Sequence, residues 1–368
     1  MDDKKADAWF LGLENDFAET KGGVQICTQE FYAMLERCGL GLQRRLFSPD
    51  QTMKAKLRRR LFRKPFPDIV PQCFLNDLRS AYAEKPPAAI FFNRVNLAPL
   101  ALELRKEFTA SRFILLSHGL MIMDELHGHE AAYRAKWLGK ILLEEKAQRA
   151  AFDLVFTLTQ EECALEHWLG TPRAAWFPRV VSRAPLNWNP KCGRVGFVGT
   201  LDHPPTHQAL EAILNALEAA NLPVDFRLRI VGGPERLGSV FASAHTFIDY
   251  LGPLSDADLE REAATWCCFA HPLFAFARGC STKLASALGW EIPVLATPQG
   301  LRGYVWESGV IPNESTPHTF ANSLVCLSRL ENATKLRVDI QMAAHTSPSL
   351  EFVAERALAE LRKLGLNL

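Results

Sequence analysis

The chain has 368 residues, of which 48% are hydrophobic and 23% are charged, a composition typical of a globular protein. Its length exceeds one ordinary core and suits two domains of about 150–200 residues each. Lys and Arg outnumber Asp and Glu by 42 to 41, and this near balance argues against a general nucleic-acid binder.

No segment is typical of export or of membrane insertion. The opening MDDKKADAWF is charged and has no apolar run of secretory length behind it. No stretch approaches the roughly 20 apolar residues that span a bilayer. The nine cysteines form no C-x-x-C pattern, which favours buried thiols in a reducing compartment over a disulfide frame or a zinc site. We therefore expect a cytoplasmic protein.

Short apolar runs alternate with longer amphipathic runs along the chain, as in parallel sheets covered by helices. In the first half, strands are expected at 8–13, 42–47, 88–92, 113–117, 154–159 and 174–178. Helices are expected there at 24–38, 96–108 and 139–152. In the second half, strands are expected at 194–199, 226–233, 246–252, 267–272 and 293–297. Its helices are expected at 205–220, 256–264, 281–290, 316–330 and 349–364.

The segment SRAPLNWNPKCG at 182–193 separates the two halves. It contains prolines and asparagines and has no periodicity, which indicates an interdomain linker. We therefore predict an α/β protein of two domains. A cleft between domains is a usual place for a ligand to bind.

The stretch ARGCSTKLASALGWEIPVLATPQGLRGY at 277–304 is the most informative of the sequence. Small residues from Gly279 to Thr282 precede an apolar helix, so backbone N–H groups at its start are free to face an anion that the helix dipole favours. Lys283 adds a full positive charge within reach of a phosphate. Ser281 or Thr282 could instead cap an ordinary helix. From this segment alone, a phosphate site and an ordinary capped helix are about equally favoured.

The second half resembles the group 1 (family four) glycosyltransferases of the GT-B fold. Four blocks carry the resemblance in the family's order: GFVGTLDHPPTHQALEAIL, FRLRIVGGPE, IDYLGPLSDADLE and the segment at 277–304. The resemblance implies two facing Rossmann-like domains and a final helix that packs back on the first domain. The expected boundaries are 1–185 for an acceptor-side domain, 190–345 for a donor-binding domain and 346–368 for that last helix.

The resemblance also implies roles for single residues. The diphosphate of a nucleotide-sugar would lie against Gly279, Cys280, Ser281, Thr282 and Lys283. The nucleobase would lie close to Gly252, Pro253 and Leu254, and Thr200 would face the cleft.

Two positions depart from the usual family pattern. Many members carry two glutamates eight residues apart around the donor helix, where this chain has Arg278 and Ser286. Some subgroups have a loop close to ARGCSTK, so Arg278 has precedent. Its guanidinium could select a donor sugar bearing a carboxylate, or it could form a structural ion pair. Ser286 would offer the ribose one neutral hydrogen bond in place of a charged one. These changes leave the donor sugar open.

The first half matches the family more weakly. Gly22 and Gly23 lie where the family's first loop approaches the donor phosphates, although a plain strand-to-helix turn would use them equally. His118 follows an expected strand and precedes Gly119. A histidine there often faces the reacting sugar or the acceptor in the family, and it exchanges protons near neutral pH. A structural histidine bonded to backbone is the alternative.

Two further features of the first half indicate a function only weakly. His127, His129 and Glu130 are conceivable metal ligands, but their spacing is not diagnostic and we expect no metal. The run from Lys54 to Lys64 holds seven positive charges and no acid. It would suit contact with an anionic membrane surface or simply a solvated face, whereas nucleic acid is disfavoured.

The resemblance predicts transfer of a sugar from a nucleotide-diphosphate donor to a hydroxyl of a glycan or a lipid-linked glycan, with retention of configuration. His118, Lys283 and Arg278 are the expected catalytic residues. The donor is a co-substrate, and no cofactor is expected. The alternative is a non-catalytic relative that binds a glycan or a protein partner.

Overall fold

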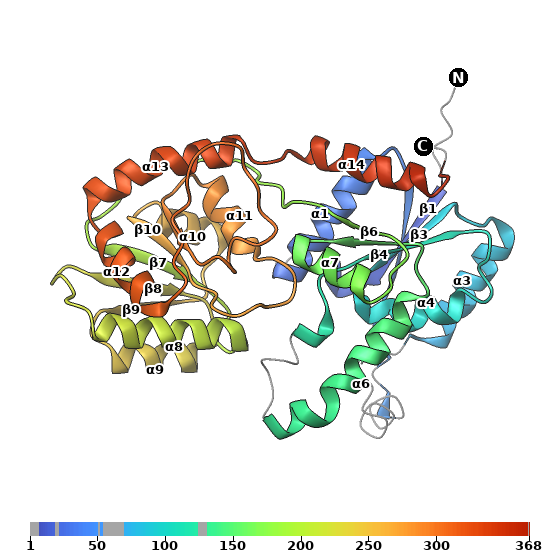
Figure 1. Ribbon diagram of the computed structural model, residues 1–368, viewed down its shortest axis with the longest axis horizontal. Helices are drawn as coiled ribbons and strands as arrows, with labels where there is room; N and C mark the ends of the chain where they lie inside the picture. The colour runs from blue at the N-terminus through green and yellow to red at the C-terminus, as the bar shows by residue number, and fades with distance from the viewer. Residues whose placement is uncertain (1–6, 19–21, 51, 54–69, 124–130, 367) are drawn as a thin grey trace. The chain divides into compact units, whose positions relative to one another are not determined.

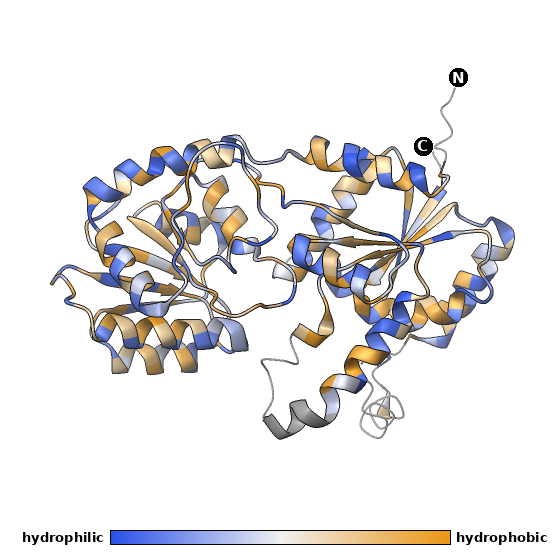
Figure 2. Cartoon of the chain, in the orientation of Figure 1, coloured by the Kyte–Doolittle hydropathy of each residue, from blue (hydrophilic) through white to orange (hydrophobic). Residues whose placement is uncertain are grey.

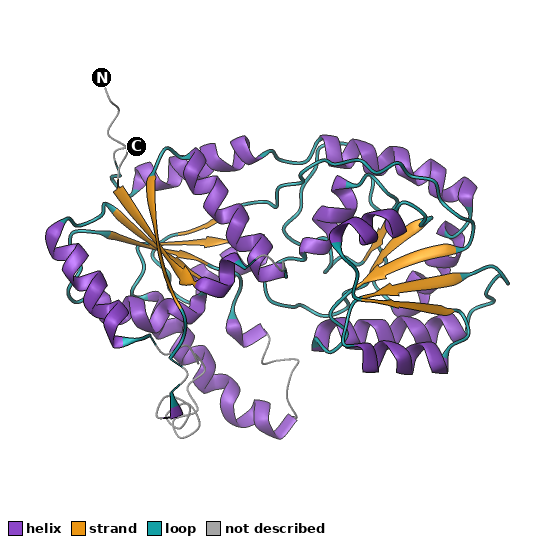
Figure 3. Cartoon of the chain, turned by 180° about the vertical axis from the view of Figure 1, so that it is seen from behind, coloured by secondary structure: helices purple, strands orange, loops and turns teal. Residues whose placement is uncertain are grey.

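The computed structural model describes the chain except residues 1–6, 19–21, 51, 54–69, 124–130 and 367. Its contacts divide the chain into two compact units (Figure 1). The first consists of Met1–Pro178 and Leu350–Leu368, and the second of Arg179–Ser349. Each unit has its own parallel sheet with helices on both faces (Figure 3). This is the α/β class of two Rossmann-like domains that the sequence predicts.

The sheet of the first unit has six parallel strands in the order β2-β1-β3-β4-β5-β6. Their bounds are β1 Asp7–Leu13, β2 Gly41–Phe47, β3 Ala89–Asn93, β4 Arg112–Leu116, β5 Leu154–Thr157 and β6 Ala174–Trp176. The helical elements are η1 Glu14–Phe17, α1 Gly23–Arg37, α3 Gln72–Glu84, η2 Val95–Leu97, α4 Ala98–Leu104, α6 Ala131–Arg149, α7 Gln160–Trp168 and α14 Leu350–Lys363.

The central strands of this sheet are apolar along their whole length because helices cover both faces. Phe10 of β1 lies opposite Phe91 of β3, which lies opposite Ile114 of β4, and all three side chains are fully buried. Continuous apolar runs are what a doubly covered parallel sheet requires. The strands are accordingly mostly hydrophobic in Figure 2, while helices such as α1 alternate. The expected strands of this half are confirmed.

The sheet of the second unit has five parallel strands in the order β11-β10-β7-β8-β9. Their bounds are β7 Arg194–Val198, β8 Arg227–Val231, β9 Ile248–Gly252, β10 Cys268–His271 and β11 Val294–Ala296. The helices are α8 Pro204–Glu218, α9 Glu235–Ala244, α10 Asp256–Ala263, α11 Thr282–Gly289, α12 Pro317–Leu327 and α13 Leu330–His345. The five expected strands are present, whereas α9 and α13, like α3 in the first unit, are helices that the sequence pattern missed.

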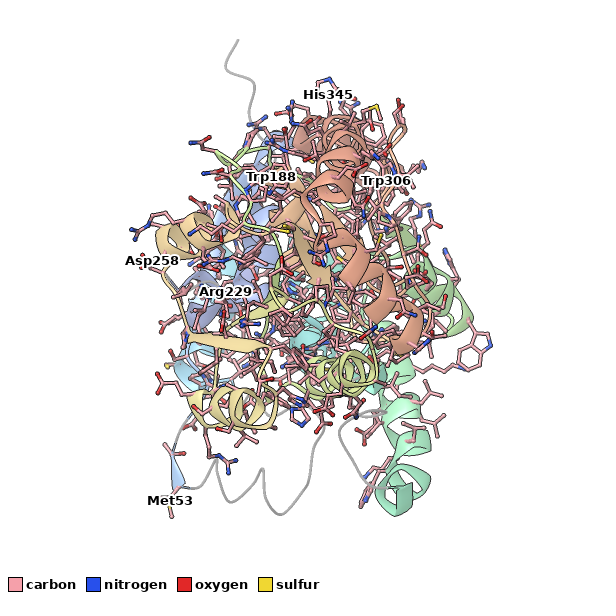
Figure 4. All side chains as sticks on the ribbon, turned by 90° about the vertical axis from the view of Figure 1, so that its left-hand side faces the viewer. Met53, Trp188, Arg229, Asp258, Trp306 and His345 are labelled. Carbon is pink, nitrogen blue, oxygen red and sulfur yellow. The ribbon has the colours of Figure 1, made fainter. Side chains whose placement is uncertain are left out.

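The last helix, α14, packs on α1 of the first unit, as the family resemblance predicts. The Cys38 thiol donates a hydrogen bond to the carbonyl of Ala354 at 3.3 Å, and Arg37 pairs with Glu351. The division between units falls after Pro178, before the predicted linker. The segment 182–193 contains no helix or strand, but its backbone bonds to the second unit, for example from Ala184 N–H to the carbonyl of Gly289. Trp188, labelled in Figure 4, donates to the carbonyl of Trp266 at 2.7 Å.

A buried ion triad joins α6 to α7 in the first unit. The Arg149 guanidinium lies 2.8 Å from Glu166 and 3.2 Å from Glu145, and all three side chains are almost completely buried. Glu145 also accepts backbone N–H groups from Met121 at 2.8 Å and Ile122 at 3.2 Å. Burial raises the pKa of Glu145 above its usual range. The triad therefore fixes the chain just after His118.

Among the described residues, no helix combines the length and the hydropathy that crossing a membrane requires.

Candidate active site

The second sheet has one point at which successive strands stop being added on one side and continue on the other. The chain runs from β7 outward through β8 to β9, and then returns to β10 on the other side of β7. Ligands of open α/β sheets bind at such a switch point, beyond the carboxyl ends of the two strands. Gly199 follows β7 there, and the loop that leads into α11 follows β10.

Lys283 carries its charge into this switch point. A Cβ atom placed on Gly199 would lie 3.3 Å from the Lys283 Nζ, so the ammonium lies against the loop after β7. The side chain is partly buried, and desolvation lowers the pKa of Lys283 to about 8. Within the described part of the chain, no carboxylate forms an ion pair with it. A desolvated cation of this kind is a site for an external anion.

The start of α11 adds backbone donors beside Lys283. Ser281 occupies the N-cap position, but its side chain caps none of the N–H groups of the first turn. The Tyr304 hydroxyl donates to the carbonyl of Ser281 and accepts the N–H of Ala285 at 2.9 Å, which braces the first turn from outside. The first N–H groups of a helix have no partner within it, and the helix dipole favours negative charge there. Capping by Ser281, the alternative for this segment, is not observed.

His271, the last residue of β10, lies beside this site and was not among the predicted residues. It is buried, and its Nε2 has no hydrogen-bond partner among the residues that the structure describes. Burial, and then the charge of Lys283, lower the pKa of His271 to about 3. The imidazole therefore stays neutral, and Lys283 is the titratable charge of the pair near neutral pH.

Glycine is required where the ends of β7 and β8 meet. Gly232 has φ +129°, and a Cβ there would lie 1.9 Å from the carbonyl oxygen of Gly199. Gly232 also donates its N–H to the carbonyl of Gly252 at 3.0 Å. The loops after β7, β8 and β9 are thus held together along one edge of the sheet.

The structure places the other predicted donor residues on this same edge. Thr200 and Pro253 are exposed, Leu254 is partly exposed, and Gly252 has φ +71° with open space where a Cβ would be. Leu254 also lines a hollow of about 300 Å³ with Leu251, Asp258, Arg261 and Glu262. These residues follow β7 and β9, whereas Lys283 follows β10.

Arg278 and Ser286 lie before and within α11. Both are partly exposed, and Ser286 is one turn beyond the helix start. Arg278 directly precedes Gly279, whose φ of +66° turns the chain toward the helix, and Cys280 follows it. The two departures from the family pattern therefore lie next to the residues that are predicted to bind the diphosphate.

In the first unit, the predicted residues lie at the carboxyl edge of the sheet or begin α1. Gly22 and Gly23 are exposed at the start of α1, where Gly22 N–H donates to the side chain of Gln25 at 3.1 Å. His118 follows β4, is buried, and has its Nε2 2.8 Å from the Oδ1 of Asn93. The contact that Nε2 makes is therefore to a side chain and not to the backbone.

Two predicted features lie outside the described residues. These are the basic run from Lys54 to Lys64 and the group of His127, His129 and Glu130. Within the described ranges, no group of three or more His, Cys, Asp or Glu side chains is arranged to hold a metal ion.

A comparison with known protein families identifies a family that the second unit matches. Residues 192–329 match the family model described as glycosyl transferases group 1. The chain carries a group 1 glycosyltransferase domain. The matched residues contain β7 to β11 and therefore the whole switch point with Lys283. This match confirms the family that the four sequence blocks predict for the second half of the chain. No curated protein matches the chain significantly.

Solved structures show that the chain has the GT-B fold over nearly its whole length. Sucrose-phosphate synthase from Thermosynechococcus elongatus superposes with a TM-score of 0.69 at 15% identity, covering 98% of this chain and 99% of that one. Anabaena HepE, in complex with UDP and glucose, gives 0.65 at 14% identity, covering 97% and 100%. The lipopolysaccharide outer core galactosyltransferase WaaB gives 0.62 at 12% identity, covering 97% and 99%. At these identities the likeness concerns the fold.

Proposed function

We propose that the protein transfers a glycosyl group from a nucleotide-diphosphate sugar to a hydroxyl of a glycan or lipid-linked glycan, with retention of configuration. The observation that carries this proposal is Lys283, a desolvated ammonium at the start of α11 that no described carboxylate neutralises. A diphosphate brings two or more negative charges to this place. It would satisfy both the ammonium and the backbone N–H groups of the first turn.

The same groups would supply the catalysis. Breaking the bond between the sugar and the diphosphate builds up negative charge on the leaving phosphate oxygen. A fixed ammonium and fixed N–H groups stabilise that charge without reorganising. The proposal includes no cofactor, and no metal ion is needed if these protein groups neutralise the diphosphate. His118 would act on the sugar or the acceptor hydroxyl from the first unit.

Only the ligands of similar solved structures indicate which donor sugar and which base to expect. HepE was solved with UDP and glucose, and a pneumococcal O-GlcNAc transferase at 13% identity with UDP and GlcNAc. UDP is therefore the first nucleotide to test. Arg278 and Ser286 would contact the sugar and the ribose, with the base near Gly252, Pro253 and Leu254. Contact with the inner membrane face through Lys54–Lys64 and a cytoplasmic location belong to the proposal as well.

A donor screen tests the function directly. We expect UDP, GDP or ADP to raise the melting temperature of the protein, and the matching nucleotide-sugar to be hydrolysed slowly in the absence of acceptor. Differential scanning fluorimetry followed by chromatographic detection of the released nucleotide measures both effects. Binding without hydrolysis or transfer would favour the non-catalytic alternative. No response to any common nucleotide-sugar would contradict the proposal.

Nucleotide affinity is expected to fall as pH rises above 8. The pKa of Lys283 is about 8 in the unliganded protein, and an anion favours the protonated amine. Affinity should be full below pH 8 and should weaken by up to about tenfold per pH unit above it. Calorimetric titration with UDP, or with the nucleotide that the screen identifies, measures this between pH 7 and 10.

Lys283→Arg is the matched control for the pH dependence, because a guanidinium stays charged throughout this range. Its affinity should be nearly independent of pH. An equally flat profile for the unmodified protein would show that Lys283 does not neutralise the bound phosphate.

A further inference from the structure

A buried chain of hydrogen bonds leads to His118 across three strands of the first sheet. Asp16 lies just beyond β1, Asn93 ends β3, and His118 follows β4. Thr28 of α1 and Arg94 complete the set, which we call the His118 network. We propose that Asp16 and Asn93 are positioning residues that hold the His118 ring in the tautomer with its proton on Nε2. This inference rests on the proposed role of His118 in sugar transfer.

The first step concerns Asp16, which serves only as an acceptor. Its side chain is completely buried. Oδ2 accepts the N–H of Leu13 at 3.1 Å and the amide of Asn93 at 2.8 Å, and Oδ1 accepts Arg94 Nη1 at 2.8 Å. The carboxylate therefore accepts a guanidinium and two further N–H groups, and both of its oxygens act as acceptors.

The second step fixes the amide of Asn93. Because the Asp16 oxygens act as acceptors, the atom of Asn93 that faces Oδ2 must be the NH2 nitrogen. Nδ2 donates its second hydrogen to the Thr28 hydroxyl at 2.9 Å. Both hydrogens of the NH2 group are therefore used. The amide cannot be turned over without setting its carbonyl oxygen against the carboxylate, and Oδ1 is left to face His118.

The third step transfers this polarity to His118. The Asn93 Oδ1 is an acceptor, so the His118 Nε2, 2.8 Å away, must carry a proton. In the neutral ring, the lone pair then belongs to Nδ1. The centroid of the His118 ring also lies 5.6 Å from the centroid of the Phe31 ring, and this packing limits rotation of the imidazole. A His118 ordered in this way would present Nδ1 as a hydrogen-bond acceptor, which is the polarity that a group taking a proton from a sugar or acceptor hydroxyl needs.

A purely structural role for these residues makes a different prediction. Asp16 also caps the start of η1 by accepting the N–H of Leu13, so its replacement could lower stability without any effect on His118. The tautomer of His118 is the property that separates the two roles. It can be observed without a donor or an acceptor.

The experiment is nitrogen-15 NMR of the full chain with labelled histidine, in which long-range proton–nitrogen correlations report the tautomer. His118→Gln identifies the His118 signals. We expect the unmodified protein to show a protonated, exchange-protected Nε2 and an unprotonated Nδ1 at neutral and higher pH. In Asn93→Leu, the ratio of Nε2–H to Nδ1–H tautomer should fall about five- to thirtyfold, and Nε2–H should exchange faster with water. Thr28→Ser keeps the second acceptor of Asn93 and should retain the original pattern.

A His118 in the Nδ1–H tautomer in the unmodified protein would overturn the inference, and this spectrum decides even if Asn93→Leu does not fold. An unchanged ratio and exchange rate in a folded Asn93→Leu would overturn it as well. The proposed function fails separately. Absence of sugar transfer together with the expected spectrum would contradict the role of His118 in transfer but leave the network intact. Transfer together with the Nδ1–H tautomer would contradict only the network.

Discussion

Replacing Lys283 with methionine is expected to reduce turnover of the nucleotide-sugar by about a hundred- to a thousandfold, the usual cost of removing one group that stabilises a developing oxyanion. Lys283 lies in the first turn of α11, and methionine retains most of its apolar stem. The backbone N–H groups remain, so weak nucleotide binding should persist. Donor hydrolysis at saturating nucleotide-sugar measures the change.

The same replacement should leave the protein as stable as before or make it more stable. Burial lowers the folded-state pKa of Lys283 to about 8, so the fold disfavours the protonated amine at pH 7. That penalty is full below pH 8 and disappears as pH rises above the unfolded pKa. Removing the amine should therefore add about 1–3 kcal/mol to the free energy of unfolding at pH 7. Lys335→Met, at a side chain that is 71% exposed, is the matched control and should change neither property. A Lys283→Met protein that loses stability together with activity would indicate a structural lysine.

Replacing Arg149 with methionine is expected to lower the free energy of unfolding by about 3–5 kcal/mol. The change would leave the carboxylates of Glu145 and Glu166 buried without a counter-charge, and the low dielectric of the interior makes that costly. Chemical denaturation at pH 7 measures the loss. Arg261→Met removes a guanidinium that is 78% exposed, where it pairs with Asp258, and should cost less than about 1 kcal/mol.

The pH dependence of this loss distinguishes orphaned charges from lost packing. The pKa of Glu145 is already raised by burial, and removing Arg149 should raise it further. A raised folded-state pKa contributes stability at low pH that is lost as pH rises. The free energy of unfolding of Arg149→Met should therefore approach that of the unmodified protein as the pH falls from 7 to 5. Adding Glu145→Gln and Glu166→Gln should recover part of the stability at pH 7. A loss that is independent of pH would mean that Arg149 acts mainly by filling space.

The elements that the sequence predicted best are those whose burial leaves a clear pattern. Every expected strand is present, because strands such as β3 and β4 are apolar on both faces. The helix α13 was missed because its buried residues are mostly alanines, namely Ala333, Ala343 and Ala344 beside Ile340, which give little hydrophobic periodicity. The helix α3 buries only Leu75 and Leu78, so it too reads as polar sequence.

The candidate site was predictable where neighbours in sequence form it. The glycine, small residues and lysine from Gly279 to Lys283 are contiguous, so the amino-acid order alone reveals their chemistry. Tyr304 beside the start of α11 and Asn93 beside His118 were missed because each comes from another strand or loop of its own unit. Their place depends on the strand order, which the sequence alone does not specify. His271 lies within the expected strand 267–272, but its burial beside Lys283 is a property of the folded sheet.

The return of the chain to the first unit through α14 affects how the protein can be divided. The second unit is one continuous stretch, Arg179–Ser349, whereas the first is assembled from two separate stretches. The second unit can therefore be cut out as a single segment with one start and one end. The first has no such segment, because removing everything after residue 349 would also strip α14 from α1 and expose the apolar face that Val353, Ala354 and Ala357 cover. In the order of the sequence, the second unit is inserted between the two stretches of the first, even though it contains the residues that match the family model.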